Sequence, residues 1–244
     1  MNEEFIYGVH PVIEALKNET TINKLFIKRD LADKQRKQIL DLANSKKIIV
    51  STVSKSKLDE LTKDQNHQGV VASIAAYEYA ELEDIFELAK SKKEDPMIVI
   101  LDKIEDPHNL GSILRTADAA GVHGIIIPKR RAVQLTGTVA KTSTGAIEYV
   151  PVVRVTNISQ TVDFLKERGV WIFGTDVNGE NYSTWNAKGP VAIIIGNEGN
   201  GIGEALLKKV DQVLTIPMVG HVQSLNASVA ASLLIYQAFN SRHK

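Results

Sequence analysis

Short apolar runs recur along residues 96–244, and stretches with helical spacing separate several of them. The runs are nearly continuous in Val, Ile and Leu, as in "MIVIL" and "VAIII", which is typical of strands covered on both faces. They predict strands starting at Met97, Gly124, Glu148, Val170, Val191 and Gln212, and a final helix over about 226–241. Strands that alternate with helices favour a mostly parallel sheet with helices on both faces, so we expect an α/β fold.

Residues 1–75 show shorter alternating elements. Strands are predicted around 25–27, over 47–53 and from Gly69, and helices from Pro11 to about Lys17 and over 34–43. Proline suits a first helical position, so the first helix is expected to begin at Pro11. The pattern predicts a small α/β domain over 1–75.

The stretch 76–95 combines helical spacing with a strong acidic excess. Leu82, Ile85, Phe86 and Ala89 fall on one helical face, and Pro96 is expected to end the helix. The stretch carries 3 basic and 7 acidic side chains, whereas 1–75 carries 12 and 10, and 96–244 carries 14 and 12. We interpret 76–95 as a solvated acidic connector, containing the domain boundary, between two mildly basic units.

Composition narrows the class of protein. A chain of 244 residues that is 43% hydrophobic suits one large domain or two smaller ones. It contains no long apolar run, and its acidic start lacks the basic-then-apolar order of a signal peptide, so neither a membrane span nor secretion is expected. Cysteine is absent, which excludes disulfides, Cys-bound zinc and thiol catalysis. We expect a cytoplasmic protein.

A glycine-rich stretch, "IIIGNEGNGIGEAL" at 193–206, is the first candidate for a ligand site. A dinucleotide fits poorly, because Leu206 stands where the Rossmann fingerprint requires a third glycine after Gly201 and Gly203. A Walker loop is excluded, since no G-K-S or G-K-T occurs. A flexible loop without a ligand is the alternative. Asn197 and Glu198 weigh against it, because they place polar groups at the end of a buried strand, where open α/β sheets bind ligands.

A second cluster, "DKIEDPHNLGSILRTADAAG", follows the strand that starts at Met97. Asn109 is expected to cap a helix that begins at Leu110. Arg115 is by default a surface cation, but the helix around it is otherwise apolar or small, which suggests that its guanidinium faces something fixed.

A third cluster, "LTIPMVGHVQSLNASVAASLLIYQ", starts at Leu214. A strand is expected to end at Pro217, and Ser224 and Asn226 mark the start of the last helix, where capping alone would explain them. His221 has no evident carboxylate partner, so a general-base role is disfavoured. The six His residues are scattered, and no metal site is predicted.

Together and in this order, the three clusters resemble the motifs of the SpoU–TrmH branch of the SPOUT RNA ribose 2′-O-methyltransferases. The matching runs are "NLGSILRTA" at 109–117, "IGNEGNG" at 195–201 and "IPM…SLNASVA" within 216–230. "YGVHPVIEAL" from Tyr7 and "HQGVVA" from His67 resemble the small ribosomal-protein-like substrate-binding domain of this branch. The two-domain layout is similar to that of bacterial enzymes that methylate a guanosine in large-subunit (23S) ribosomal RNA.

The resemblance implies S-adenosylmethionine as methyl donor, no metal, and a deep trefoil knot in the domain at 96–244. It implies catalytic roles for Asn109, Arg115, Glu198 and Asn226. It implies that the donor is bound by Thr175, Gly196, Gly201, Ile216, Met218, Ser224 and Leu225. We expect Arg115 to bind a phosphate and the developing alkoxide rather than to remove a proton, because a guanidinium is a hydrogen-bond donor only. Asn109 is then expected to hold Arg115.

The resemblance also implies a homodimer, and ribosomal RNA as a partner, either as free RNA or within an assembling large subunit. In that dimer, the alanines at 227, 230, 231 and 238 would allow close helix packing, and Leu234 and Ile235 would add apolar surface. Two other functions stay open. One is a transfer-RNA ribose 2′-O-methyltransferase of the same branch, and the other is a non-catalytic RNA-binding or ribosome-assembly factor on the same fold.

Overall fold

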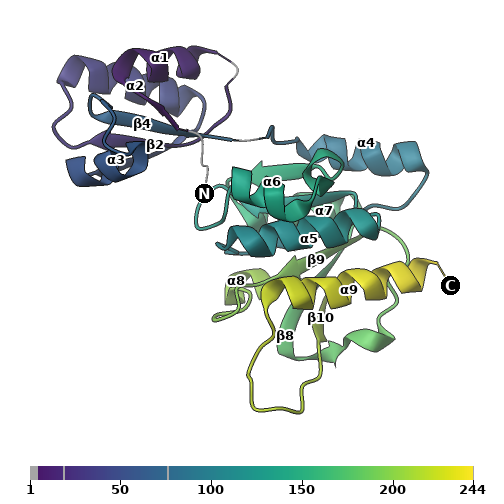
Figure 1. The fold of residues 1–244 in the computed structure, drawn as a ribbon. Coiled ribbons are helices and arrows are strands. Elements are labelled where there is room, and N and C mark those ends of the chain that lie inside the picture. Colours follow the sequence, from purple (N-terminus) through teal and green to yellow (C-terminus); the bar gives the residue numbers. More distant parts are fainter. Residues whose placement is uncertain (1–4, 19, 76, 244) are drawn as a thin grey trace. The chain divides into compact units, whose positions relative to one another are not determined.

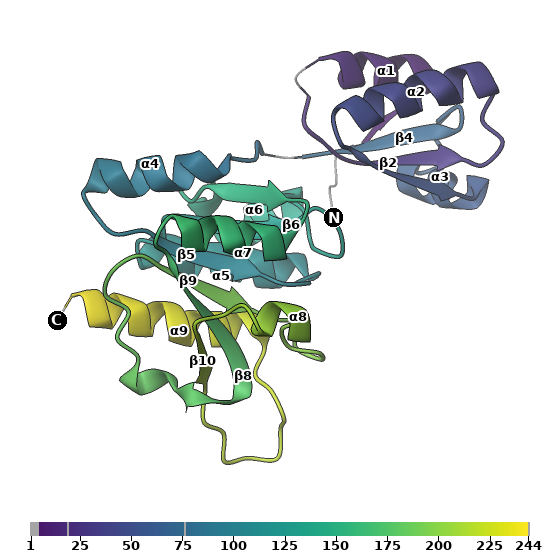
Figure 2. The same ribbon diagram turned by 180° about the vertical axis from the view of Figure 1, so that it is seen from behind.

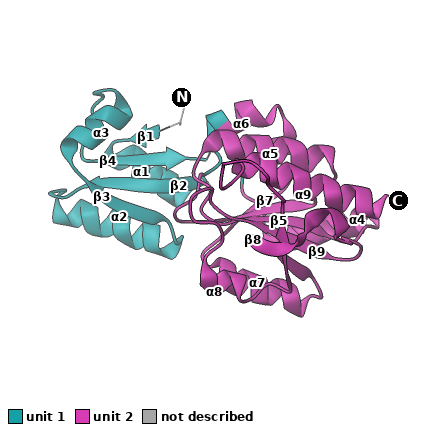
Figure 3. Cartoon of the chain, turned by 90° about the horizontal axis from the view of Figure 1, so that it is seen from below, with its two compact units in different colours: residues 1–78, 134–138 teal, residues 79–133, 139–244 magenta. Residues whose placement is uncertain are grey.

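The computed structural model describes residues 5–18, 20–75 and 77–243, and the chain divides into two compact units. Unit 1 comprises the described residues up to Glu78 together with Gln134–Thr138 (Figure 3). Unit 2 comprises Tyr79–Val133 and the described residues from Val139 onward. The boundary therefore lies at 78/79, and a short internal segment of the second half belongs to the first unit.

Unit 1 is a four-stranded sheet with three helices (Figure 1). Its strands lie in the order β1-β4-β2-β3, in which β4 is antiparallel to β1 and β2, and β2 is parallel to β3. The elements are β1 (Phe5–Tyr7), α1 (Val9–Lys17), β2 (Ile22–Lys28), α2 (Asp33–Ser45), β3 (Ile49–Val53), α3 (Lys55–Thr62) and β4 (Val70–Ile74). Apolar side chains of α1 and α2 pack on β2 and β4 to form its core.

The start of α1 differs from the prediction. The helix begins at Val9, preceded by Gly8 with a φ of 94°, a conformation that glycine adopts without strain. Pro11 is therefore the third helical residue, where a missing N–H breaks no intrahelical bond. β1 and α3 were not predicted, because a three-residue strand shows no periodicity and α3 buries only Leu58 and Thr62.

Unit 2 is built on a six-stranded sheet in which every strand pair is parallel. The strand order is β10-β8-β9-β5-β6-β7. The strands are β5 (Met97–Leu101), β6 (Gly124–Pro128), β7 (Val152–Val155), β8 (Trp171–Asn181), β9 (Val191–Ile195) and β10 (Gln212–Thr215). β10 ends at Thr215 rather than at Pro217, and β7 starts after Glu148 because residues 146–148 form a 3₁₀ helix.

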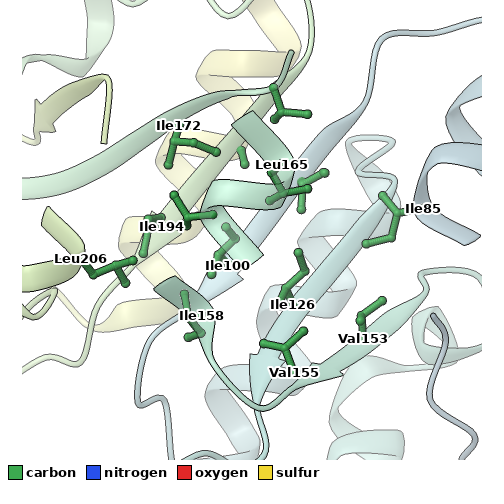
Figure 4. Close-up of a cluster of buried hydrophobic side chains, with 14 of the residues drawn as sticks. Ile85, Ile100, Ile126, Val153, Val155, Ile158, Leu165, Ile172, Ile194 and Leu206 are labelled. Carbon is green, nitrogen blue, oxygen red and sulfur yellow. The ribbon is translucent and has the colours of Figure 1, made fainter. Parts of the chain in front are cut away.

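Helices cover both faces of this sheet, which confirms the predicted α/β class (Figure 2). On one face, α4 (Leu82–Lys92), α7 (Ile158–Glu167) and α8 (Glu204–Leu207) enclose the apolar cluster of Figure 4, to which Ile100 and Ile194 contribute. On the other face, α5 (Pro107–Ala119) and α9 (Ala227–Arg242) lie side by side. A short α6 (Gly137–Ser143) and a second 3₁₀ helix (Tyr182–Thr184) complete the elements. The trefoil knot stays a prediction.

Residues 82–92 are part of unit 2 and not a solvated connector. Ile85 of α4 is fully buried in the cluster of Figure 4, and Leu82 and Phe86 pack against it. The guanidinium of Arg168 stacks on the Phe86 ring and donates two hydrogen bonds, of 2.5 and 2.6 Å, to the carboxylate of Glu83. The acidic excess thus lies on the solvent side of a helix whose other side covers the sheet.

Candidate active site

A pocket of about 530 Å³ opens where β9 and β10 end, beside the middle of the longer strand β8. The carboxyl ends of the strands are where open parallel sheets bind their ligands. The pocket walls come from β8, from the glycine-rich loop after β9, from the segment 214–225 and from the first turns of α9. Every residue expected to bind the donor lies on these walls, namely Thr175, Gly196, Gly201, Ile216, Met218, Ser224 and Leu225.

The glycine-rich loop presents backbone to the pocket because it folds back on itself. A side chain at Gly196 would overlap the backbone of Gly201 and Ile202, so only glycine fits there. Gly201 has a φ of 60°, and its N–H donates to the carbonyl of Asn197 at 2.8 Å. The side chain of Asn197 holds the loop from both sides, since its Oδ1 accepts from Gly199 N at 2.9 Å and its Nδ2 donates to the carbonyl of Lys103 at 3.3 Å. A ligand can therefore approach the main chain closely.

Three of the predicted catalytic residues form one hydrogen-bonded chain beside this loop. Asn226 Nδ2 donates to Asn109 Oδ1 at 2.9 Å, and Asn109 Nδ2 donates to Glu198 Oε1 at 2.6 Å. Glu198 is half-buried and lines the pocket, whereas Asn109 is buried on α5. These two hydrogen bonds therefore connect α5 and the start of α9 to the Glu198 carboxylate of the glycine-rich loop, at the pocket wall.

The Glu198 carboxylate and the Asn226 amide also accept hydrogen bonds from backbone N–H groups at the start of α9. Glu198 Oε1 accepts from Ala227 N at 3.3 Å, and Asn226 Oδ1 accepts from Ser228 N at 3.0 Å and from Val229 N at 3.3 Å. A helix start leaves N–H groups without intrahelical partners, and it favours a negative charge nearby. Asn226 thus caps α9, as predicted, and bonds to Asn109 with the other end of its amide.

Asn109 is not a helix cap, so that prediction was wrong. α5 begins at Pro107, and Asp106 is its cap, accepting a hydrogen bond from His108 N at 2.8 Å. The Asp-Pro pair is a start signal in the sequence, because aspartate is a favoured cap and proline a favoured first helical residue. Asn109 is therefore inside the helix, where its side chain is free to bond across to Glu198 and Asn226.

Arg115 is separated from this chain of hydrogen bonds. It lies six residues after Asn109 on α5, which corresponds to a rise of about 9 Å along the helix. Its side chain is exposed and makes no hydrogen bond or ion pair with the described residues. The structure does not show the expected support of Arg115 by Asn109, because both ends of the Asn109 amide are bonded to other residues.

Asp102 is a site residue that sequence reasoning did not single out. Its buried carboxylate follows β5 directly, and Oδ2 accepts from Gly203 N at 3.3 Å and lies 3.6 Å from Lys103 Nζ. It therefore fixes the far end of the glycine-rich loop. Its place immediately after an apolar strand was the available signal.

The last helix also differs from expectation. Leu234 and Ile235 are fully buried within the chain, as are Ala231 and Ala238, because α9 packs on α5 and the sheet. A hydroxyl pair, Thr116 Oγ1 and Ser232 Oγ at 3.0 Å, joins the two helices. Leu234 and Ile235 are therefore not available to a second subunit.

The part of the chain that the structure describes contains no group of three or more His, Cys, Asp or Glu side chains placed to hold a metal ion. Among the same residues, no helix combines the length and the apolar character needed to cross a membrane.

Comparison with known proteins decides the family. The model of the SpoU rRNA Methylase family matches residues 96–236, which include all three motif runs. The chain belongs to the SpoU methylase family. A second model, described as RNA 2′-O ribose methyltransferase substrate binding, matches residues 5–80. The predicted SpoU–TrmH branch of RNA methyltransferases is therefore confirmed.

Relatives of this SpoU methylase match along almost its whole length. YacO of Bacillus subtilis (strain 168), named for the TrmH family of tRNA/rRNA methyltransferases, is 49% identical over 98% of this chain and 96% of its own. A TrmH-family relative from Staphylococcus haemolyticus is 52% identical over 100% of this chain and 98% of its own.

Solved structures give the same result for the fold. The SpoU methyltransferase AviRb from Streptomyces viridochromogenes, in complex with the cofactor AdoMet, aligns with a TM-score of 0.61 at 27% identity, covering 97% of this chain and 89% of AviRb. An AdoMet-bound rRNA methyltransferase from Sinorhizobium meliloti aligns with a TM-score of 0.60 at 26% identity, covering 97% of this chain and 86% of the Sinorhizobium meliloti enzyme.

Proposed function

We propose that this SpoU methylase uses S-adenosylmethionine to methylate the ribose 2′-hydroxyl of a guanosine in large-subunit ribosomal RNA. The observation that carries the proposal is the Asn109–Glu198–Asn226 chain of hydrogen bonds at the wall of the 530 Å³ pocket. The model matched by unit 1, for substrate binding by RNA 2′-O ribose methyltransferases, supports ribose as the acceptor.

The pocket suits S-adenosylmethionine in size and chemistry. Its volume of about 530 Å³ falls in the range of roughly 300–1,000 Å³ that is usual for ligand sites. Gly196 and Gly201 offer bare backbone, and Ile216 and Leu225 offer apolar side chains for an adenine ring. AviRb and the Sinorhizobium meliloti enzyme, with which this chain aligns, were both solved with AdoMet.

The chain's own residues have separate tasks in this proposal. Bound S-adenosylmethionine supplies an electrophilic methyl group. Asn109 donates a hydrogen bond to the Glu198 carboxylate, and Asn226 donates one to Asn109. The carboxylate is thereby held at the pocket wall, where it orients the methyl donor and the acceptor ribose. Arg115, whose guanidinium has no partner among the described residues, donates hydrogen bonds to a substrate phosphate and to the alkoxide that develops on the ribose oxygen. Unit 1 selects the RNA, and two copies of the chain form a homodimer.

Mapping of 2′-O-methylated positions tests the function directly. RNA from cells with and without this protein should differ at one guanosine of the large-subunit ribosomal RNA. The purified protein should then transfer a tritiated methyl group from S-adenosylmethionine to the RNA that lacks this modification. Methylation of transfer RNA alone would favour the transfer-RNA enzyme of the same branch. Absence of transfer to either RNA would favour a non-catalytic RNA-binding factor.

A further inference from the structure

A second pocket of unit 2 lies at the carboxyl ends of β5, β6 and β7. Its volume is about 310 Å³, at the lower end of the usual range for ligand sites. Pro128, Ile158 and Leu206 give it an apolar floor. The basic side chains of Lys103, Arg130 and Arg131 also line it. An apolar floor with cations around it suits a ligand that has both a flat apolar part and a negative charge.

The positive charge of this pocket is not balanced within the chain. Arg130 and Arg131 are exposed, and neither makes a hydrogen bond or an ion pair with the described residues. Asp102 is the only acidic residue among those that line the pocket, and its buried carboxylate already serves Gly203 N and Lys103. The pocket therefore carries a net positive charge that has no evident role in folding.

Two of the three cations also have an unusual backbone. Lys103 has a φ of 60° and Arg131 a φ of 54°, values in the left-handed region that favours glycine. Strained positions of this kind concentrate at functional sites. The conformation therefore adds weight to a binding role for the side chains at these two positions.

This pocket shares a wall with the pocket that suits S-adenosylmethionine. Gly201 lines the first pocket and Gly203 lines the second. Two residues apart, their Cα atoms are at most about 7 Å from each other. The wall is also braced from the side of the second pocket, because Asn197 Nδ2 donates to the carbonyl of Lys103 and Gly203 N donates to Asp102. A substrate that reaches one pocket is thus close to the other.

We propose that the 310 Å³ pocket binds an unpaired nucleotide of the RNA substrate, close in the chain to the nucleotide that is methylated. Its base lies on the floor formed by Pro128, Ile158 and Leu206, and its phosphates bind Arg130, Arg131 and Lys103. Unpaired bases are commonly held by stacking on side chains, including arginine planes, while cations bind the backbone. A bare inorganic anion would leave the apolar floor empty. This inference rests on the proposed function in taking RNA as the substrate.

Two variants test separately how the cations and the apolar floor of this pocket contribute to RNA binding. Arg130→Gln combined with Arg131→Gln removes two phosphate contacts, and Ala205→Trp fills the pocket without a change of charge, since Ala205 lines it. The control is Lys90→Gln combined with Lys188→Gln, which makes the same change in net charge at exposed positions outside both pockets. The probe is large-subunit ribosomal RNA isolated from cells that lack this protein.

The measurements are RNA affinity by filter binding over a range of salt concentrations, binding of S-adenosylmethionine, and single-turnover methyl transfer. The double arginine variant should bind the RNA about tenfold or more weakly, with a salt dependence less steep by about 1–2 in the log–log slope. Ala205→Trp should also weaken RNA binding and leave that slope unchanged. S-adenosylmethionine binding and melting temperature should match those of the control in both variants.

RNA affinity of the double arginine variant equal to that of the control would overturn the inference while leaving the proposed function intact. A wild-type protein that binds the RNA but transfers no methyl group would refute the proposed function, and the affinity comparison would still decide on the pocket. A wild-type protein that does not bind this RNA would overturn both.

Discussion

Arg115 is an exposed cation with no partner among the described residues, so its removal should leave the fold intact. We expect Arg115→Ala and Arg115→Lys to lower single-turnover methyl transfer by about two orders of magnitude, as loss of an oxyanion donor does. Lysine should not rescue the rate, because it keeps the charge but loses the planar fork that can hold two oxygens. Melting temperature and S-adenosylmethionine affinity should stay at wild-type values.

The control for Arg115 is Lys188→Ala, another exposed cation without an ion pair in the described chain, which should retain full activity. A folded Arg115→Ala protein with the wild-type rate would remove Arg115 from the catalytic machinery. Unfolding of the variant would instead assign Arg115 a structural role that its exposure does not suggest.

Gly196 allows a second prediction at the scale of one residue. Gly196→Ala should weaken S-adenosylmethionine binding about tenfold or more, because its Cβ would overlap the backbone of Gly201 and Ile202. Forced overlap in a packed region costs about 1–3 kcal/mol, and here it must move the loop that lines the pocket. Calorimetric titration measures the change. Gly203→Ala is the matched control, since the nearest atom to its Cβ would be the flexible Lys103 Nζ at 3.6 Å. Equal affinities of the two variants would show that the loop adapts.

The residue that sequence reasoning misread is Asn109. A polar residue before an apolar run resembles a cap, and the two partners that explain it lie 89 and 117 residues away in the chain. Spacing within one helix carries no information about such distant bonds. The family motifs did bring Asn109, Glu198 and Asn226 together correctly, whereas the support of Arg115 by Asn109 was an inference about contact that no motif contains.

At the scale of elements, the strands of unit 2 were predictable because their residues are buried on both sides. Ile98 and Ile100 of β5 face the cluster of Figure 4, their neighbour Val99 faces the opposite side, and all three are fully buried. The helix α4 was interpreted as part of a solvated connector because only one side of it is buried. Seven acidic side chains dominate the average composition of 76–95, but the packing of the helix is determined by the one buried row that contains Ile85 and Ala89.

A buried histidine joins three elements of unit 2 at their ends. His123 precedes β6, its Nδ1 accepts a hydrogen bond from Met97 N at 3.0 Å, and its Nε2 lies 3.1 Å from a Glu94 carboxylate oxygen. Burial lowers the pKa of His123 from its ordinary value of 6.5, with Lys92 and Arg242 acting in the same direction and Glu94 opposing them. The folded protein therefore binds this proton less readily than the unfolded chain does.

The sign of the pH dependence follows from this lowered pKa. Above about pH 6.5 the histidine is neutral in both states, so its contribution to the free energy of unfolding is fully present. As the pH falls below that value the unfolded chain takes up the proton first, and stability declines by at most about 1.4 kcal/mol per pH unit. Urea unfolding between about pH 5 and pH 8 should show a steeper decline for the wild type than for His123→Gln. His10→Gln, at an exposed position, should behave like the wild type. Parallel curves for His123→Gln and the wild type would contradict the assignment.

At the scale of the whole molecule, the proposed homodimer has to use surface that the single chain leaves exposed. Leu234 and Ile235 are buried, whereas Val229 and Tyr236 of α9 are 48% and 44% exposed and line a groove along the helix. We expect light scattering at micromolar concentration to give the mass of a dimer, and Tyr236→Lys to give a monomer because it places a charge in the apolar surface. Trp171→Lys, at the exposed start of β8, should remain dimeric. A monomeric wild type would refute the proposal.

Unit 1 can be tested by its removal. Deletion of residues 1–78 should leave a folded unit 2 that binds S-adenosylmethionine and methylates ribosomal RNA at least about tenfold more slowly, since the substrate-binding match lies at 5–80. Gln134–Thr138 lose their packing in this variant, so circular dichroism must first show that unit 2 is folded. Undiminished activity on the natural RNA would exclude unit 1 as the substrate-binding part.

The bond between Asn226 and Asn109 also sets an order in which the candidate site can be assembled. The ribosome makes Asn226 117 residues after Asn109, and α9 follows Asn226. A growing chain therefore completes the strands of unit 1, which end at Ile74, and then the sheet of unit 2, which ends at Thr215, before it can close the site. Until α9 has left the exit tunnel and packed on α5, Glu198 lacks its contact with Ala227. A chain that ends before Asn226 therefore lacks two of the contacts at the wall of the proposed donor pocket, the one to Asn109 and the one between Glu198 and Ala227.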